Sequence, residues 1–189
     1  MKPLAPTTPH VIIMVGIPGA GKTAFAEHFA HTFQSPYINP SVISTQIGVD
    51  ADATEKITQL LFNELLKTNR TLVYEGSTFT KVQRLAITNY VTKAGYRPLI
   101  VWVQTEAVEA GRRATSKLRG RERLTEKQFD AALRQFQAPT DSEQPVVISG
   151  KHTYATQLKV VLKRIAGTTR PDTPPQQPRV PSGRNIIVR

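Results

Sequence analysis

The chain has no cysteine among its 189 residues, which excludes disulfide bonds and thiolate-bound zinc as sources of stability. It also lacks a long hydrophobic run. The apolar stretch at residues 11–15 is far too short to span a bilayer, and it does not have the form of a cleaved signal peptide. We therefore expect a soluble, cytoplasmic protein with no membrane segment. Its hydrophobic content of 39% suits one compact domain.

A glycine-rich segment follows this apolar stretch. Residues 16–23 read GIPGAGKT and fit the G-x-x-x-x-G-K-[ST] phosphate-binding loop (Walker A), with a helical stretch after them. The N–H groups of such a loop form a nest for anions, and the following helix adds its positive N-terminal end. The predicted nucleotide-binding residues are Gly16, Pro18, Gly19, Ala20, Gly21, Lys22, Thr23 and Ala24.

Two side chains of the loop carry the expected chemistry. The ammonium group of Lys22 would reach the β- and γ-phosphates as a point charge, and the hydroxyl of Thr23 would complete the oxygen shell of a Mg²⁺ ion. The predicted cofactors are therefore ATP and Mg²⁺.

Positive charge is concentrated in two segments. The formal net charge is +11, and residues 112–123 carry six basic side chains against one acid. The segment from residue 167 onward adds four arginines against one aspartate, and it is rich in proline. We predict a flexible N-terminal segment at 1–9, a nucleotide-binding domain at 10–166 and a basic C-terminal tail at 167–189. An anionic partner is expected, either nucleic acid or a phosphorylated metabolite.

Strand-like and helix-like segments alternate between these ends. This order predicts an α/β protein with the P-loop NTPase fold, in which a parallel five-stranded sheet has helices on both faces. The predicted strands lie near residues 11–15, 36–39, 71–75, 98–103 and 145–148.

Helix starts and helix faces can also be predicted. Reciprocal N-terminal caps are expected for the pairs Asp52 with Glu55, Thr80 with Gln83 and Thr125 with Gln128. Gly95 and Gly167 stand where helices should end. Apolar stripes assigned to the core comprise Ile57, Leu60, Leu61 and Leu65; Phe129, Ala132, Leu133 and Phe136; and Leu158, Val161, Leu162 and Ile165.

Two further signals lie after predicted strands. Glu75 ends an apolar strand, where a carboxylate would face the metal of a phosphate-loop protein, although a solvated acid at a strand end fits the same pattern. The basic cluster at 112–123 follows the fourth predicted strand. Arg113 and Lys117 are four residues apart, so they would share a helical face and contact phosphate as a kinase-type lid; a solvated basic face is the alternative.

Residues 10–166 resemble the small P-loop kinases that include polynucleotide 5'-hydroxyl kinases and zeta-toxin sugar-nucleotide kinases. The resemblance rests on the loop at 16–23, on Glu75 with Arg84 in the next helix, on the strand at 99–103, on the Arg113 and Lys117 pair, and on the segment 136–145. It implies ATP-dependent phosphoryl transfer. Such kinases place an Asn and then an Asp after the second strand, and the Asp takes the acceptor proton. Asn39 matches, whereas Ser41 stands where the Asp is expected.

A serine has no useful basicity near neutral pH, so another carboxylate would have to act. Asp50 and Asp52 lie a few residues downstream and Glu75 is a third candidate, while Asp50 and Asp52 would otherwise serve as helix caps. The predicted catalytic residues are Lys22, Asp50, Glu75, Arg113 and Lys117. We expect a kinase acting on a hydroxyl acceptor, such as a nucleic acid 5'-end or a sugar nucleotide. The alternatives are a regulatory nucleotide-binding protein without transfer activity and a nucleic-acid-binding module with a secondary ATP site.

Overall fold

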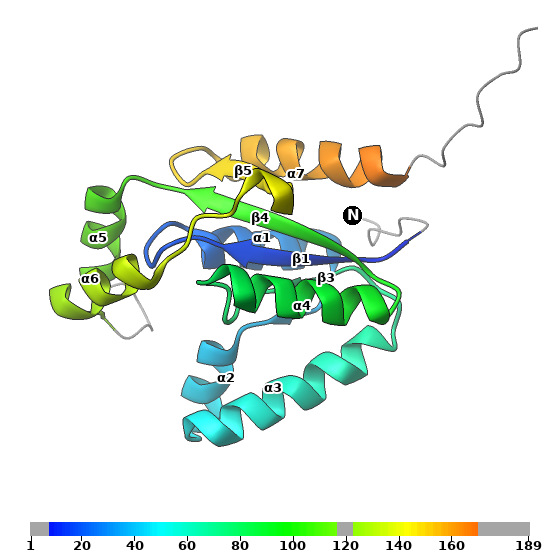
Figure 1. The fold of residues 1–189 in the computed structure, drawn as a ribbon, viewed down its shortest axis with the longest axis horizontal. Coiled ribbons are helices and arrows are strands. Elements are labelled where there is room, and N and C mark those ends of the chain that lie inside the picture. Colours follow the sequence, from blue (N-terminus) through cyan, green and yellow to red (C-terminus); the bar gives the residue numbers. More distant parts are fainter. Residues whose placement is uncertain (1–7, 117–122, 170–189) are drawn as a thin grey trace, which may run out of the picture.

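All five predicted strands are present in the computed structural model, which describes residues 8–116 and 123–169. They form one fully parallel sheet in the order β2-β3-β1-β4-β5. Its strands are β1 (His10–Val15), β2 (Tyr37–Ile38), β3 (Leu72–Tyr74), β4 (Arg97–Gln104) and β5 (Val146–Ser149). Figure 1 shows the strands side by side with helices before and behind them. The predicted fold class is confirmed.

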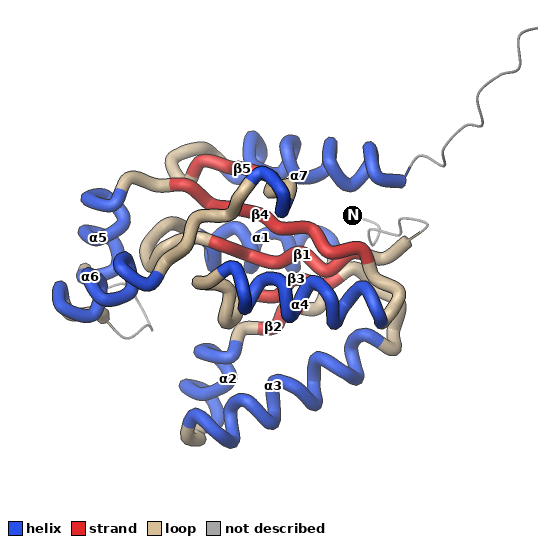
Figure 2. The backbone as a smooth tube through the Cα atoms, in the orientation of Figure 1, coloured by secondary structure: helices blue, strands red, loops and turns tan. Residues whose placement is uncertain are grey.

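Helices connect successive strands, as parallel pairing requires. They are α1 (Lys22–Phe33), α2 (Pro40–Ile47), α3 (Ala51–Leu66), α4 (Lys81–Lys93), α5 (Ala107–Thr115), α6 (Glu126–Gln135) and α7 (Tyr154–Thr169), with a short 3₁₀ turn at Asp141–Glu143. In Figure 2, α5 and α6 lie together beyond the carboxyl ends of β1 and β4, whereas α2 and α3 lie beside β2 and β3. None of the described helices is long and apolar enough to cross a membrane.

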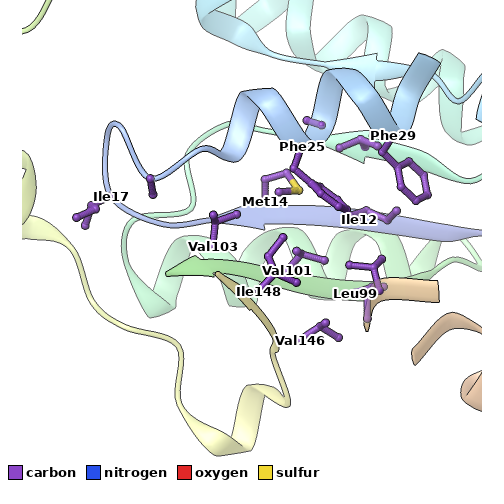
Figure 3. Packing of buried hydrophobic residues seen from close by; sticks show 14 of the residues in the cluster. Ile12, Met14, Ile17, Phe25, Phe29, Leu99, Val101, Val103, Val146 and Ile148 are labelled. Carbon is purple, nitrogen blue, oxygen red and sulfur yellow. The ribbon is translucent and has the colours of Figure 1, made fainter. Parts of the chain in front are cut away.

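Alternate residues of β1 face two separate cores, one on each side of the sheet. Ile12 and Met14 pack with residues of α1 and α7, including Phe25 and Val161, as Figure 3 shows for the α1 side. The intervening residues of β1 pack on the other side with α3 and α4, where Phe62 is buried. This alternation follows from the two-residue period of a strand, and burial on both faces explains why residues 11–15 of β1 are all apolar.

Two of the three predicted helix caps are confirmed. Thr80 and Thr125 form the predicted capping boxes with Gln83 and Gln128. The predicted cap at Asp52 is wrong because α3 begins two residues earlier: the N-cap is Asp50, whose Oδ1 accepts a hydrogen bond from the Ala53 amide at 2.8 Å. Asp52 instead lies inside the first turn and pairs with Lys56 at 2.6 Å.

The predicted core face of α3 is wrong in part, since Leu65 packs against the core but the middle of the predicted stripe does not. Leu60 and Leu61 are 62% and 42% exposed, while Phe62 and Leu66 lie in the core and Thr54 and Thr58 are buried on the same face. Two neighbouring stripes of this helix contain large apolar residues, and the aromatic contacts of Phe62 with Tyr74 and Tyr90 select between them. Periodicity alone does not distinguish the two stripes.

One of the two predicted helix ends is confirmed. Gly95 follows the end of α4 with a φ of 83°, a left-handed conformation that suits glycine. Gly167, in contrast, lies inside α7, which continues to Thr169. Helix α7 thus extends three residues past the domain boundary that we predicted after residue 166.

Candidate functional site

The phosphate loop connects the carboxyl end of β1 to the first turn of α1. Gly21 is the N-cap of α1, and both Lys22 and Thr23 lie in its first turn, so their side chains begin at the positive end of the helix. The ammonium group of Lys22 donates hydrogen bonds to the carbonyl oxygens of Gly16 and Ile17 at 2.9 and 3.1 Å. The lysine therefore extends back over the loop, where a bound phosphate chain would lie.

The tip of the loop packs closely against α5. Gly19 has a φ of 76°, and a Cβ atom added there would lie 2.1 Å from the carbonyl oxygen of Ala110. Glycine is therefore required at this position both by the backbone conformation and by the close approach. The predicted lid helix thus lies directly on the loop, as expected for a kinase-type arrangement.

The segment after β5 supports the loop from another side. A Cβ atom added to Gly150 would lie 2.1 Å from the carbonyl oxygen of Ala20. The same carbonyl accepts a hydrogen bond from the hydroxyl of Thr105 at 2.9 Å, immediately after β4. Three elements that are distant in sequence therefore hold the loop in its conformation.

Glu75 lies directly after β3 and faces the first turn of α1. The hydroxyl of Thr23 donates a hydrogen bond to Glu75 Oε1 at 2.8 Å. The phenol of Tyr37 donates to Glu75 Oε2 at 2.6 Å, and the amide of Asn39 approaches the same oxygen at 3.3 Å. Burial, followed by the charge of Glu75, raises the pKa of Tyr37 far above its ordinary value of 10, so the phenol keeps its proton and remains a donor.

The donor set at this point fits Mg²⁺. The hydroxyl of Thr23 points its hydrogen at Glu75, which leaves the oxygen lone pairs available to a cation. Magnesium prefers oxygen ligands and is often bound through one or two protein groups plus substrate phosphates. In the described part of the chain, no group of three or more His, Cys, Asp or Glu side chains could hold a metal ion.

Arg113 of α5 links the lid helix to the segment after β5. Its Nε donates to Glu109 at 2.8 Å, and its Nη1 donates to the carbonyl of Gly150 at 3.1 Å. Glu109 also accepts two hydrogen bonds from Arg112, and these, followed by the bond from Arg113, lower the pKa of Glu109 to about 2. Arg113 therefore contacts the segment that packs against the phosphate loop, and its contact with phosphate stays a prediction. Its predicted partner Lys117 lies outside the described residues.

The candidate base residues lie on the α2 and α3 side. Asp50 is exposed and caps α3, as described above. Ser41 lies in the first turn of α2, where its amide donates to Asn39 Oδ1 at 3.0 Å. The structure therefore brings Thr23, which follows Lys22 in the chain, into contact with Glu75, whereas the Asp50 side chain accepts a hydrogen bond that caps α3.

Sequence reasoning missed two features. The sequence predicts Tyr37 only as part of the strand near residues 36–39. Its contact with Glu75 leaves no pattern in the local sequence, because 38 residues separate the two. The second feature is a cavity of about 500 Å³ beside the loop. It is lined by residues that include Ile17, Trp102, Gln104, Leu133, Phe136 and Lys151.

Arg84 forms a buried clamp between α4 and the segment 137–143. Its side chain is fully buried and forms an ion pair with Glu143 at 2.6 Å. Its Nη1 also donates to the carbonyls of Thr78, Phe79 and Gln137. The resemblance to kinases singled out this arginine and the segment 136–145, and the structure shows that the two are in contact.

Comparisons with known proteins agree with this geometry. A family model described as an AAA domain matches residues 11–139. Kti12 of Chaetomium thermophilum, in complex with ADP-AlF3, has a TM-score of 0.65 at 15% identity, with 85% of this chain and 100% of that chain covered. A gluconokinase from Sinorhizobium meliloti 1021 has a TM-score of 0.61 at 16% identity, with 85% and 94% covered.

A sugar kinase from Janibacter sp. HTCC2649, in an unliganded structure, has a TM-score of 0.58 at 16% identity, with 86% of this chain and 98% of that chain covered. At these identities the likeness shows the fold alone, which is the parallel α/β fold of P-loop NTPases that the sequence predicts. No curated protein matches the chain significantly.

Proposed function

Because the chain belongs to the AAA domain family, we propose that it is an ATP-dependent phosphotransferase that uses Mg²⁺ and transfers the γ-phosphoryl group to a hydroxyl acceptor. The observation that carries the proposal is the hydrogen bond of 2.8 Å between Thr23 and Glu75. It joins the phosphate loop to an acid at the end of the neighbouring strand. A hydroxyl and a carboxylate at this place are the protein groups that a Mg²⁺–nucleotide complex needs.

Each step of the proposed reaction has a candidate residue. The acceptor oxygen bonds to the γ-phosphorus, the bond from that phosphorus to the β–γ bridging oxygen breaks, and ADP leaves. Lys22 and Arg113 would stabilise the charge that spreads over the phosphoryl oxygens, together with Lys117 of the proposed lid. Asp50 would accept the proton of the acceptor hydroxyl in the place of the missing Asp. Mg²⁺ would supply charge neutralisation between Thr23 and Glu75.

The fold relatives favour transfer over binding alone. Two of them are, by name, a gluconokinase and a sugar kinase. Kti12 was solved with ADP-AlF3, which supports a nucleotide at the phosphate loop. The basic cluster supports an acceptor that carries phosphate, either a nucleic acid end or a phosphorylated metabolite. Ser41 supports the second candidate function, a regulatory nucleotide-binding protein without transfer.

Incubation with γ-labelled ATP tests the proposal. The full chain and Mg²⁺ would be offered oligonucleotides, nucleosides, sugars and sugar nucleotides, and we expect label to appear on one of these classes. Lys22→Ala should weaken nucleotide binding or transfer by about 10- to 150-fold, because it removes charged hydrogen bonds worth about 1.5 to 3 kcal/mol. Lys56→Ala is the matched control, since Lys56 is an exposed lysine on α3.

Two outcomes would overturn parts of the proposal. Equal ATP affinity and turnover in Lys22→Ala and Lys56→Ala would show that the phosphate loop is not the nucleotide site. Binding of MgATP that depends on Lys22, with no label transferred to any acceptor class, would favour the regulatory function.

A further inference from the structure

The carboxylate of Glu75 is held on both of its oxygens. Oε2 accepts from the Tyr37 phenol at 2.6 Å and from the Asn39 amide at 3.3 Å, and Oε1 accepts from Thr23 at 2.8 Å. The amide of Asn39 also donates to the phenol oxygen at 2.9 Å. Tyr37 therefore lies between Asn39 and Glu75: its phenol oxygen accepts a hydrogen bond from Asn39, and its hydroxyl donates a short one to Glu75.

The orientation of Asn39 is fixed by the backbone. Its Oδ1 caps α2 by accepting from the amides of Ser41 and Val42 at 3.0 and 3.4 Å. Because an amide carbonyl only accepts hydrogen bonds, these two donors place the Nδ2 group on the other side, toward Tyr37 and Glu75. The chain of contacts thus runs from the start of α2 to the first turn of α1.

We propose that Tyr37 is a positioning residue that holds Oε2 of Glu75 away from the metal and so keeps Oε1, beside the Thr23 hydroxyl, as the oxygen that serves the Mg²⁺–nucleotide complex. This inference rests on the proposed nucleotide site. Without the phenol, Oε2 keeps only the longer bond from Asn39, and the carboxylate can rotate about its last torsion, which has a broad and shallow energy profile.

Groups that orient metal ligands usually change metal affinity when they are removed. Loss of such a hydrogen bond typically costs about 10- to 100-fold in metal affinity or activity. Nucleotide and Mg²⁺ bind together, so the effect can be measured as a coupling: the factor by which Mg²⁺ tightens nucleotide binding. This factor can be measured without phosphoryl transfer.

The experiment compares Tyr37→Phe with Tyr96→Phe in the full chain. Tyr96 is a matched control because its phenol, like that of the half-buried Tyr37, donates a hydrogen bond, in its case to the carbonyl of Leu66 at 2.9 Å at the far end of α3. Titration of a fluorescent ADP analogue, in EDTA and in saturating Mg²⁺, gives the coupling factor of each protein. Melting temperatures record the structural cost of each substitution.

We expect Tyr37→Phe to reduce the coupling factor by about tenfold. If the wild-type coupling factor is itself below about ten, we expect the variant to show none, which is a factor of one. Nucleotide affinity in EDTA should change less than about twofold. Tyr96→Phe should lower the melting temperature and leave the coupling factor unchanged. Equal coupling factors in Tyr37→Phe and the wild type would overturn the inference. So would an equal loss of affinity with and without Mg²⁺, because that result describes a general structural role.

The same titration separates this inference from the proposed function. Mg²⁺ coupling that depends on Tyr37, in a protein that labels no acceptor, would support the positioning role and contradict phosphoryl transfer. Nucleotide binding in the wild type that is insensitive to Mg²⁺ would contradict the positioning role even if transfer were observed.

Discussion

Thr23 and Glu75 are 52 residues apart in the chain, yet their side chains meet at 2.8 Å. The contact arises because β1 and β3 are neighbours in a parallel sheet, so their carboxyl ends lie at the same edge. Each residue alone has an ordinary explanation: Thr23 could be only a residue of the first helical turn, and Glu75 could be only a solvated acid. Their contact is what makes the metal-shell role of Glu75 the better proposal.

The proposed role of Asp50 as acceptor base can be tested without disturbing its cap. Asparagine caps a helix about as well as aspartate, so Asp50→Asn removes the negative charge and keeps the bond to Ala53. If Asp50 is the base, transfer should fall by about a hundredfold or more while the melting temperature stays the same. Transfer is measured with labelled ATP, and stability by thermal unfolding.

Asp52→Asn is the control for this experiment. Asp52 is 77% exposed and pairs with Lys56 on the surface of α3, so its substitution should leave both transfer and stability nearly unchanged. Full transfer in Asp50→Asn would exclude Asp50 as the base. Glu75→Gln would then be the next variant to test.

At the scale of elements, a buried ion pair joins α4 to the segment before β5. Arg84→Ala should lower the free energy of unfolding by about 3 to 5 kcal/mol, because Glu143 loses its ion-pair partner and the carbonyls of Thr78, Phe79 and Gln137 lose the guanidinium donor. Urea unfolding measures this loss. Arg134→Ala, which removes an exposed arginine of α6, should have almost no effect. Similar values for the two variants would contradict the importance of the clamp.

The same ion pair predicts a dependence of stability on pH. The hydrogen bond from Arg84 lowers the pKa of Glu143 below the ordinary value of 4.5. As the pH falls, Glu143 is therefore protonated in the unfolded chain before it is protonated in the folded one. The stabilisation is therefore fully present above pH 4.5 and is lost as the pH falls through the lowered pKa. Urea unfolding between pH 7 and pH 3 should show a smaller decrease for Glu143→Gln than for the wild type. Parallel curves would contradict this assignment.

At the scale of the whole molecule, the distribution of positive charge suggests how the acceptor class can be identified. Of the basic cluster at 112–123, the residues 117–122 lie outside the described structure, as does the tail from residue 170 onward. The contribution of the tail to binding is therefore a question for solution experiments.

Removal of residues 170–189 deletes four arginines and one aspartate. If the protein binds single-stranded nucleic acid through this tail, the slope of log affinity against log salt should become shallower by up to about 3 units. Nucleotide affinity and melting temperature should not change. Oligonucleotide titrations at several salt concentrations measure the slope, and an unchanged slope would exclude the tail from the binding surface.

The sequence by itself determined the features that depend on neighbours along the chain. The phosphate loop, the five strands and the capping boxes at Thr80 and Thr125 follow from local spacing, because each is formed by residues within a few positions of one another. The fold class followed from the alternation of these elements, since parallel strands need helical crossovers.

The tertiary structure alone decided which distant groups meet. Two stripes of α3 were apolar enough to be buried, and contact with Tyr74 and Tyr90 selected the one that contains Phe62. The bond from Tyr37 to Glu75 and the clamp between Arg84 and Glu143 span 38 and 59 residues. Such contacts leave no periodic signal in one sequence, because the order of strands in the sheet and the packing of helices on its faces bring the partners together.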